Sequence, residues 1–236
     1  MSVDDRTAPV GVGPEGTLTD QKQTPPTVDE YFLGAEWTMC HVLRTTQSDQ
    51  ALIDEVLHAT EALHERLGLR YQYRGVQERD DGGRLFTFSE TEKRNTRLRV
   101  IQDDAAASRY LEIKGPDAQT CWDIGQAISE RMTFWEISEL IAHARESGLG
   151  SPGVLLNVAL ATPGKVSPEA ARLFEEGLRS PDAKIRFAAA IAISVVPEPR
   201  FVSALDDALE LASDPREQNL FQDIAARCFD AVMPNS

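Results

Sequence analysis

Hydrophobic and polar residues alternate from residue 37 to residue 45, and this two-residue period predicts a β-strand. The residues that share one face of it are Trp37, Met39, His41 and Leu43. Four more runs of strand character follow further along the chain, at Tyr71–Glu78, Arg84–Ser89, Arg97–Gln102 and Arg109–Lys114. The gaps between these runs are short, so we expect consecutive strands to pair antiparallel.

A helical spacing of apolar residues predicts a helix over residues 49–67, between the first strand and the other four. Ser48 is a suitable N-cap, and Gly68 stands where a helix-ending glycine belongs. A second helix is predicted over residues 117–131, after the last strand. The order β-α-β-β-β-β-α indicates an α+β arrangement, with helices against one face of an antiparallel sheet.

Beyond residue 133 the strand pattern does not recur, and helical patterns follow one another with Pro and Gly between them. The predicted helices cover residues 134–147, 152–161, 167–179, 182–196, 199–212 and 215–232. Three of them are opened by Ser-Pro or Asp-Pro, at residues 151, 180 and 214. These separations of about 29 and 34 residues are typical of helical-hairpin repeats.

The predicted helix over residues 182–196 carries the clearest signature in the chain. It matches D-x-x-V-R-x-x-A-A at Asp182, Ile185, Arg186, Ala189 and Ala190. With this signature the segment resembles the second helix of a HEAT-type repeat, which implies a surface for a protein partner. We expect Asp182 to pair with Arg186 one turn later. Because the helix is apolar on almost every side, we also expect it to be sandwiched between other helices.

The predicted fold class is α+β: an N-terminal antiparallel sheet with two helices, followed by an all-α, HEAT-like helical stack resembling a short α-solenoid. The predicted divisions are a disordered tail at residues 1–28, an α+β domain at 29–133 and a HEAT-like helical domain at 134–236. Two alternatives stay open. An irregular helical bundle could replace the stack, and the tail could be an arm that folds on contact with a partner.

The net charge of −14 narrows the choice of partner. Nucleic-acid binding depends on Lys and Arg that neutralise phosphates, so a nucleic-acid partner is disfavoured. The charge is uneven, with a balance of +3 over residues 66–114 and −8 over residues 115–236. Such an acidic surface favours a basic protein partner. With no apolar run of membrane-spanning length and no secretory signal at the N-terminus, we expect a cytoplasmic protein without membrane association.

Residue types with catalytic or metal-binding chemistry are scattered rather than grouped. Cys40, Cys121 and Cys228 are far apart and odd in number, which favours free buried thiols over a disulfide or zinc framework. His58 and His64 lie too far around one predicted helix to share a metal ion. The glycines at positions 11, 13 and 16 lack the flanking strand and helix of a phosphate-binding loop. We therefore predict no catalytic residue, no cofactor and no metal site.

Two weak candidates for partner binding remain. Arg97 and Arg99 share one face of a strand, which we expect to face solvent beside Tyr110, and arginine with an aromatic neighbour is typical of interface hot spots. The alternative is a cross-strand pair between an arginine and a glutamate. Trp122 and Trp135 lie where the sheet meets the helices, and they either plug the seam or line a ligand pocket there.

The leading interpretation is a non-enzymatic protein-binding or adaptor protein with a basic partner. A bacterial immunity protein that masks a basic toxin is one concrete form of this function. The alternative is a small-molecule-binding protein or an enzyme whose site lies at the domain junction, near Trp122 and Trp135.

Overall fold

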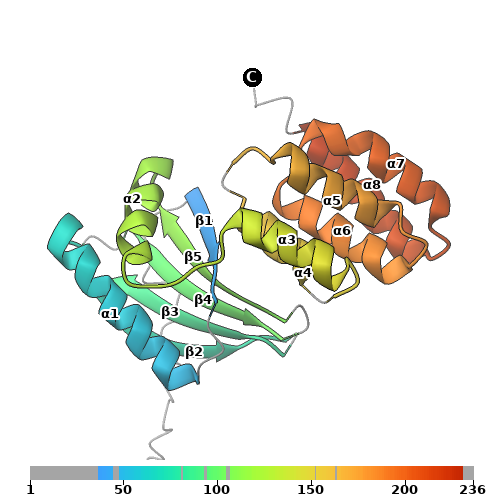
Figure 1. Ribbon diagram of the computed structural model, residues 1–236. Helices are drawn as coiled ribbons and strands as arrows, with labels where there is room; N and C mark the ends of the chain where they lie inside the picture. The colour runs from blue at the N-terminus through green and yellow to red at the C-terminus, as the bar shows by residue number, and fades with distance from the viewer. Residues whose placement is uncertain are drawn as a thin grey trace, which may run out of the picture.

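A five-stranded antiparallel sheet occupies the middle of the chain (Figure 1). The computed structural model describes residues 37–44, 48–80, 82–92, 95–104, 107–151, 153–162 and 164–230. The strands are β1 Trp37–Val42, β2 Tyr71–Glu78, β3 Arg84–Glu90, β4 Arg97–Asp103 and β5 Ser108–Gly115. Their order in the sheet is β1-β5-β4-β3-β2, so β1 and β2 form its two edges.

Two helices cover one face of this sheet, α1 (Asp49–Leu67) and α2 (Ala118–Ser129) (Figure 1). Ser48 caps α1 by accepting a hydrogen bond from the Ala51 N–H, and Gly68 ends the helix in the left-handed region with φ 69°. The core between helices and sheet is built of apolar side chains, among them Leu52, Leu63, Phe86, Phe88, Leu98, Leu111, Ile113 and Ile124. The five strands and two helices predicted from the pattern are confirmed, each to within a few residues.

The chain continues after α2 as a series of helices. They are α3 Ile137–Ser147, α4 Val154–Leu160, α5 Pro168–Leu178, α6 Ala183–Val195, α7 Val202–Leu211 and α8 Pro215–Asp230, with a 3₁₀ turn at Pro199–Phe201. The predicted helices are thereby confirmed. α5 packs on α6 and α7 on α8, while α6 also contacts α4 and α8 (Figure 1). Large buried side chains of this part include Phe174, Phe201 and Phe221.

The sheet and the helices after it share buried side chains. Val42 of β1 is 2% exposed and belongs to the helical core. The next residue, Leu43, forms an isolated antiparallel bridge with Phe134. On the neighbouring strand, the Ser108 hydroxyl donates a hydrogen bond to the Asn157 side chain of α4. These contacts hold β1 and β5 against the helical part.

The predicted fold class is wrong. It placed an antiparallel sheet with two helices at the N-terminus, followed by a HEAT-like stack, whereas the sheet lies in the middle of the chain with helices after it. Of the described residues, 55% are helical and 21% lie in strands. Alternating polarity locates single strands, but it does not show which hydrophobic core the side chains of a strand join. The sequence pattern therefore did not indicate that Val42 packs in the helical core. Residues 1–28, the predicted tail, lie outside the described residues, and the predicted domain boundaries stay predictions.

Helix α6 also differs from its prediction. Asp182 caps the helix by accepting a backbone hydrogen bond at 2.8 Å. The Arg186 side chain instead forms a buried ion pair with Glu217 of α8, with Nε and Oε1 2.8 Å apart. The helix is not enclosed, because Phe187 is 47% exposed and Val195 is 42% exposed. One face of α6 packs on its neighbouring helices, and the other carries apolar side chains that these helices leave open.

Candidate functional site

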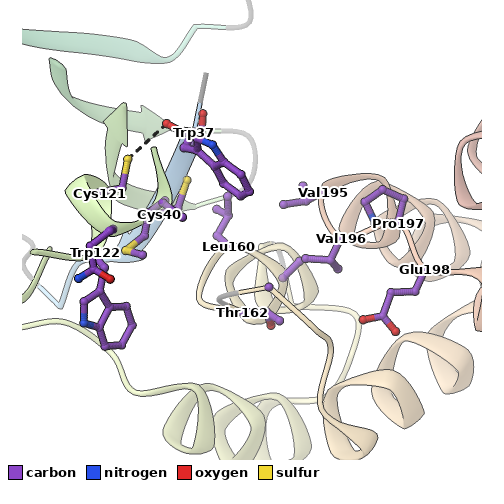
Figure 2. Close-up of a pocket in the computed structure, with 16 residues that line it drawn as sticks. Trp37, Cys40, Cys121, Trp122, Leu160, Thr162, Val195, Val196, Pro197 and Glu198 are labelled. Atoms are coloured by element: carbon purple, nitrogen blue, oxygen red, sulfur yellow. Dashed lines mark hydrogen bonds between the residues drawn. The ribbon is translucent and has the colours of Figure 1, made fainter. Parts of the chain in front are cut away.

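The edge of β1 borders a pocket of about 630 Å³ (Figure 2). Residues 37–40 of β1 form one wall, and α2 contributes a second wall that includes Gln119 and Trp122. The third wall is formed by the end of α4, which includes Leu160, and by residues 195–198 at the end of α6. The volume lies within the range that is typical of ligand sites.

β1 turns part of its backbone toward this pocket. The Leu43 N–H donates to a carbonyl oxygen of β5 at 2.9 Å, so Leu43 is bonded to that strand. Backbone groups of an antiparallel strand alternate in direction, so the N–H and C=O groups of Thr38, Cys40 and Val42 point away from β5. The Val42 C=O fits this alternation, because it accepts a hydrogen bond from the Trp135 N–H at 2.9 Å.

The described residues cover the two halves of the β1 edge differently. Residues 133–135 cover the second half of the β1 edge through hydrogen bonds to Val42 and Arg44. Within the described ranges, no other group bonds to the outward N–H and C=O of Thr38 and Cys40. The first half of β1 therefore offers two donors and two acceptors to a further strand.

The pocket extends the plane of the sheet between two helical layers. Along β1, the His41 side chain faces Gly125 of α2, while Val42 packs into the helical core on the other face. The pocket has the same two sides: Figure 2 shows Trp122 on the α2 side and Val195 on the α6 side. We call this pocket, bounded by residues 37–40, α2, Leu160 and residues 195–198, the edge slot.

Large apolar side chains stand exposed around the edge slot. Trp37 is 56% exposed, Trp122 47% and Val195 42%. The apolar surface continues along α6 through the half-buried Ile191 to Phe187, because residues four apart lie on one face of a helix. Exposed apolar side chains gathered on one surface are typical of interaction sites.

The two thiols of the edge slot are held in the protonated form. Burial, with a smaller contribution from the Glu112 carboxylate, raises the pKa of Cys40 to about 12. Burial likewise raises the pKa of Cys121 to about 11, and the Cys121 thiol donates to the Trp37 C=O at 3.4 Å. A nucleophilic cysteine needs a lowered pKa, so neither thiol is suited to covalent catalysis.

Carboxylates lie on both sides of the edge slot, and Lys114 of β5, directly opposite Thr38, adds one cation beside β1. Glu198 is the one charged side chain among its described lining residues, and its carboxylate lies 2.7 Å from the Arg200 guanidinium. On the α2 side, Asp123 accepts a hydrogen bond of 2.8 Å from the lining residue Gln119. At the start of α2, a backbone N–H lowers the pKa of Asp117, which is therefore ionised at neutral pH.

The histidines do not build a catalytic or metal centre with their neighbours. His58 lies 2.9 Å from Glu61 on the exposed side of α1. His41 is packed against the Phe134 ring at a centroid distance of 4.8 Å, and burial lowers its pKa. In the part of the chain that the structure describes, no three His, Cys, Asp or Glu residues are grouped to hold a metal ion.

Arg97 and Arg99 do not lie on a solvent-exposed face, contrary to the expectation from sequence. Arg97 is 4% exposed, and Arg99 is half-buried. Arg99 Nη1 lies 3.6 Å from Glu112 Oε1, which is the cross-strand pair considered as the alternative. Tyr110 is half-buried and packs on the helical core. Strand parity identifies residues that share a face, but it does not tell whether that face is covered.

The structure separates the two candidate tryptophans. Trp122 borders the edge slot. Trp135 lies in the seam between β1 and the helices, where the Arg44 guanidinium is 4.7 Å from its ring centroid and the His143 ring is stacked at 6.1 Å. Trp122 thus lies at a pocket and Trp135 in the seam, while a ligand for the pocket stays a prediction.

Sequence reasoning missed Trp37, Thr38 and residues 195–198 as site residues. One signal was present, since β1 reads WTMCHV, with no Asp, Glu, Lys, Arg or Pro. Edge strands usually carry such residues as protection against unwanted pairing. The signal could not be used, because the sequence does not tell which strand lies at the edge of the sheet.

Comparison with family models, curated proteins and solved structures finds no match for this chain. The HEAT-like resemblance of residues 182–190 therefore stays a prediction. Within the described ranges, no helix has both the length and the apolar character needed to cross a membrane.

Proposed function

We propose that this chain is a non-enzymatic adaptor that holds a protein partner at the edge slot. The observation that carries the proposal is the gathering of Trp37, Trp122 and Val195, all exposed, around one apolar pocket. Tryptophan is enriched among the residues that contribute most to binding free energy in protein interfaces. A partner that covers these side chains would remove their apolar surface from water.

The charge of the chain supports a basic partner. The net charge is −14, and Asp117 and Asp123 stand beside the edge slot. Complementary charges speed the encounter of two proteins, and salt screens them. An immunity protein that masks a basic toxin is one form of this function. A cytoplasmic location is part of the proposal and fits the free thiols of Cys40, Cys121 and Cys228.

The chemistry of the edge slot supports binding rather than catalysis. Its thiols have raised pKa values, and its carboxylate, Glu198, is engaged by Arg200 and by the Val166 N–H at 2.6 Å. Acid–base or nucleophilic catalysis needs a reactive group with a neighbouring activator. The described lining residues supply no such pair.

Binding of a small apolar molecule is the second candidate function. The volume of about 630 Å³ and the apolar side chains of the edge slot favour it. A ligand of this kind would raise the melting temperature of the purified chain with no protein partner present.

Affinity capture from a native extract tests the proposed function, using the tagged wild type, Trp122→Ala and the control Leu211→Ala. Leu211 is 55% exposed, but it lies on α7, far from β1 in Figure 1. We expect one basic protein in stoichiometric amount, reduced about tenfold or more by Trp122→Ala and unchanged by Leu211→Ala. Added salt should weaken the capture.

Equal capture by Trp122→Ala and the wild type would contradict the proposed function. A chain that captures no protein but is stabilised by a metabolite would replace it with the second candidate. The melting temperature of each variant serves as the control for folding.

A further inference from the structure

We infer that the partner enters the edge slot as an extended segment that pairs with β1 and adds a strand to the sheet. The inference rests on the proposed function and specifies the chemistry of the partner. The segment carries apolar side chains at alternate positions and a Lys or Arg beside them.

The backbone of β1 favours a strand over a helix as the occupant. Thr38 and Cys40 direct N–H and C=O groups into the edge slot, and no described residue bonds to them there. An extended segment satisfies these groups with its own backbone, which is the basis of recognition by strand addition. A helix could not do so, since its own backbone groups are bonded internally.

The two walls of the edge slot determine the side-chain pattern of the segment. Successive side chains of a strand point to opposite faces, so one set would meet α4 and α6 and the other set α2. Leu160, Val195 and Val196 make most of the first wall apolar, and Glu198 lies at its end. The second wall combines Trp122 with the amide of Gln119, so it accepts polar as well as apolar side chains. Apolar side chains are therefore favoured at every second position of the segment.

Charge complementarity determines the flanking residues. Asp117 and Asp123 lie at the α2 side of the edge slot, and no described lining residue is Lys or Arg. A cationic side chain next to the paired segment would meet these carboxylates, whereas an acidic one would be repelled. This agrees with a basic partner.

A phage-displayed library of random peptides, selected on the immobilised full chain, supplies the probe. We expect the selected peptides to share apolar residues at every second position with Lys or Arg beside them. In the complex, hydrogen exchange at the Thr38 and Cys40 amides should slow about tenfold or more, because both N–H groups become bonded. N-methylation of the peptide residues whose N–H groups face β1 should abolish binding, and N-methylation of the alternate set should not.

A proline variant tests the same pairing from the protein side. The Thr38 N–H is not used by β5, and proline is tolerated at such edge positions, so Thr38→Pro should fold. Its affinity for the selected peptides should fall about tenfold or more. The matched control is Val76→Pro on β2. The Arg79 N–H donates to Gly83 at 2.8 Å, and by alternation from this pair the Val76 N–H points away from β3.

Several results would overturn the inference. If the hydrogen-exchange rates of the Thr38 and Cys40 amides are unchanged in the wild-type complex, strand addition is refuted, whether or not Thr38→Pro folds. Selected peptides whose apolar residues have the spacing of a helix would also refute strand addition. Slow exchange of the two amides in the isolated monomer, or self-association through β1, would mean that another occupant already fills the edge.

The experiments distinguish failure of strand addition from failure of the proposed function. A natural partner that is lost with Trp122→Ala but kept with Thr38→Pro leaves the proposed function standing and removes strand addition. Peptides that bind as expected while Trp122→Ala captures the natural partner normally would remove the proposed function and leave the strand-binding site.

Discussion

The two edge strands of the sheet differ in regularity and in charge. β2 is irregular, with a β-bulge between Tyr73 and Gly75, and it carries the charged residues Arg74 and Glu78. Gly75 has φ 138°, a conformation that side-chain-bearing residues rarely adopt. β1 is regular along its pairing with β5 and has neither a charged residue nor proline. Bulges and charges protect an edge from pairing, so β2 is protected and β1 is open to a further strand.

The surfaces beside the two edge strands also differ, in the polarity of their side chains. A hollow of about 510 Å³ beside β2 is lined by polar and charged residues, including Glu61, His64 and Arg70. The edge slot beside β1 is walled mainly by apolar side chains. A regular edge and apolar walls occur together beside β1, and this combination is what the proposed strand addition needs.

Glu217→Ala should have the largest effect on stability, because it loosens the α6 wall of the edge slot beside β1 and leaves β2 unchanged. The Arg186 and Glu217 side chains are 6% and 7% exposed, and Arg186 Nε lies 2.8 Å from Glu217 Oε1. Removal of the carboxylate leaves a buried guanidinium without its counter-charge, at a cost of about 3–5 kcal/mol in the free energy of unfolding. Chemical denaturation measures this loss, and hydrogen exchange should locate it in α6 rather than in β2.

The control for Glu217→Ala is Glu210→Ala, which removes an exposed carboxylate from α7. It should change the free energy of unfolding by no more than about 0.5 kcal/mol. Equal effects of the two variants would show that the buried ion pair does not stabilise α6.

Gly125→Ala should have a smaller effect that is confined to the β1 side. A Cβ at Gly125 would lie 2.7 Å from His41 Nε2 and 3.3 Å from Met39 Sδ. Overpacking costs about 1–3 kcal/mol, and the better helix propensity of alanine offsets about 0.5–1 kcal/mol of it. We expect a net loss of about 1–2 kcal/mol, measured by denaturation, with faster amide exchange in β1 and unchanged exchange in β2. Gln126→Ala, at the next and exposed position, should be neutral; a loss of equal size there would refute the clash.

Thr38→Lys should have a small effect on stability but should weaken peptide binding at β1. It gives β1 a charge of the kind that β2 already carries. Thr38 is exposed, but Lys114 lies directly opposite it on β5, so repulsion between the two ammonium groups should lower the free energy of unfolding by about 0.2–1 kcal/mol. Titration with the peptides selected on the wild type should show weaker binding. Val76→Lys on β2 should bind them as the wild type does. Unchanged binding by Thr38→Lys would mean that the difference between the edges has no role in recognition.

Secondary structure could be predicted well wherever local chemistry marks its ends. Ser48 and Gly68 delimit α1 because a side-chain oxygen caps its start and a left-handed glycine closes its end. β2 was predicted with its bounds because Gly82 and Gly83 lie in the turn after it, where backbone hydrogen bonds join both to Arg79. These signals act within a few residues and need no knowledge of the fold.

The features that the sequence did not reveal depend on packing between distant segments. Arg186 was expected to pair with its neighbour Asp182, whereas its partner Glu217 belongs to another helix. Arg97 was expected to face solvent, because strand parity does not report what covers a face. The edge slot combines β1, α2, α4 and α6, so no single stretch of sequence contains its pattern.

The bridge between Leu43 and Phe134 has a consequence for the length of any bound segment. Residues 133–135 already pair with the second half of β1, so among the described residues of β1 an incoming chain finds free partners at residues 37–40. A longer β-strand would collide with residues 133–135 or have to leave the sheet there. The bridge therefore determines where the paired stretch must end, which is before Val42.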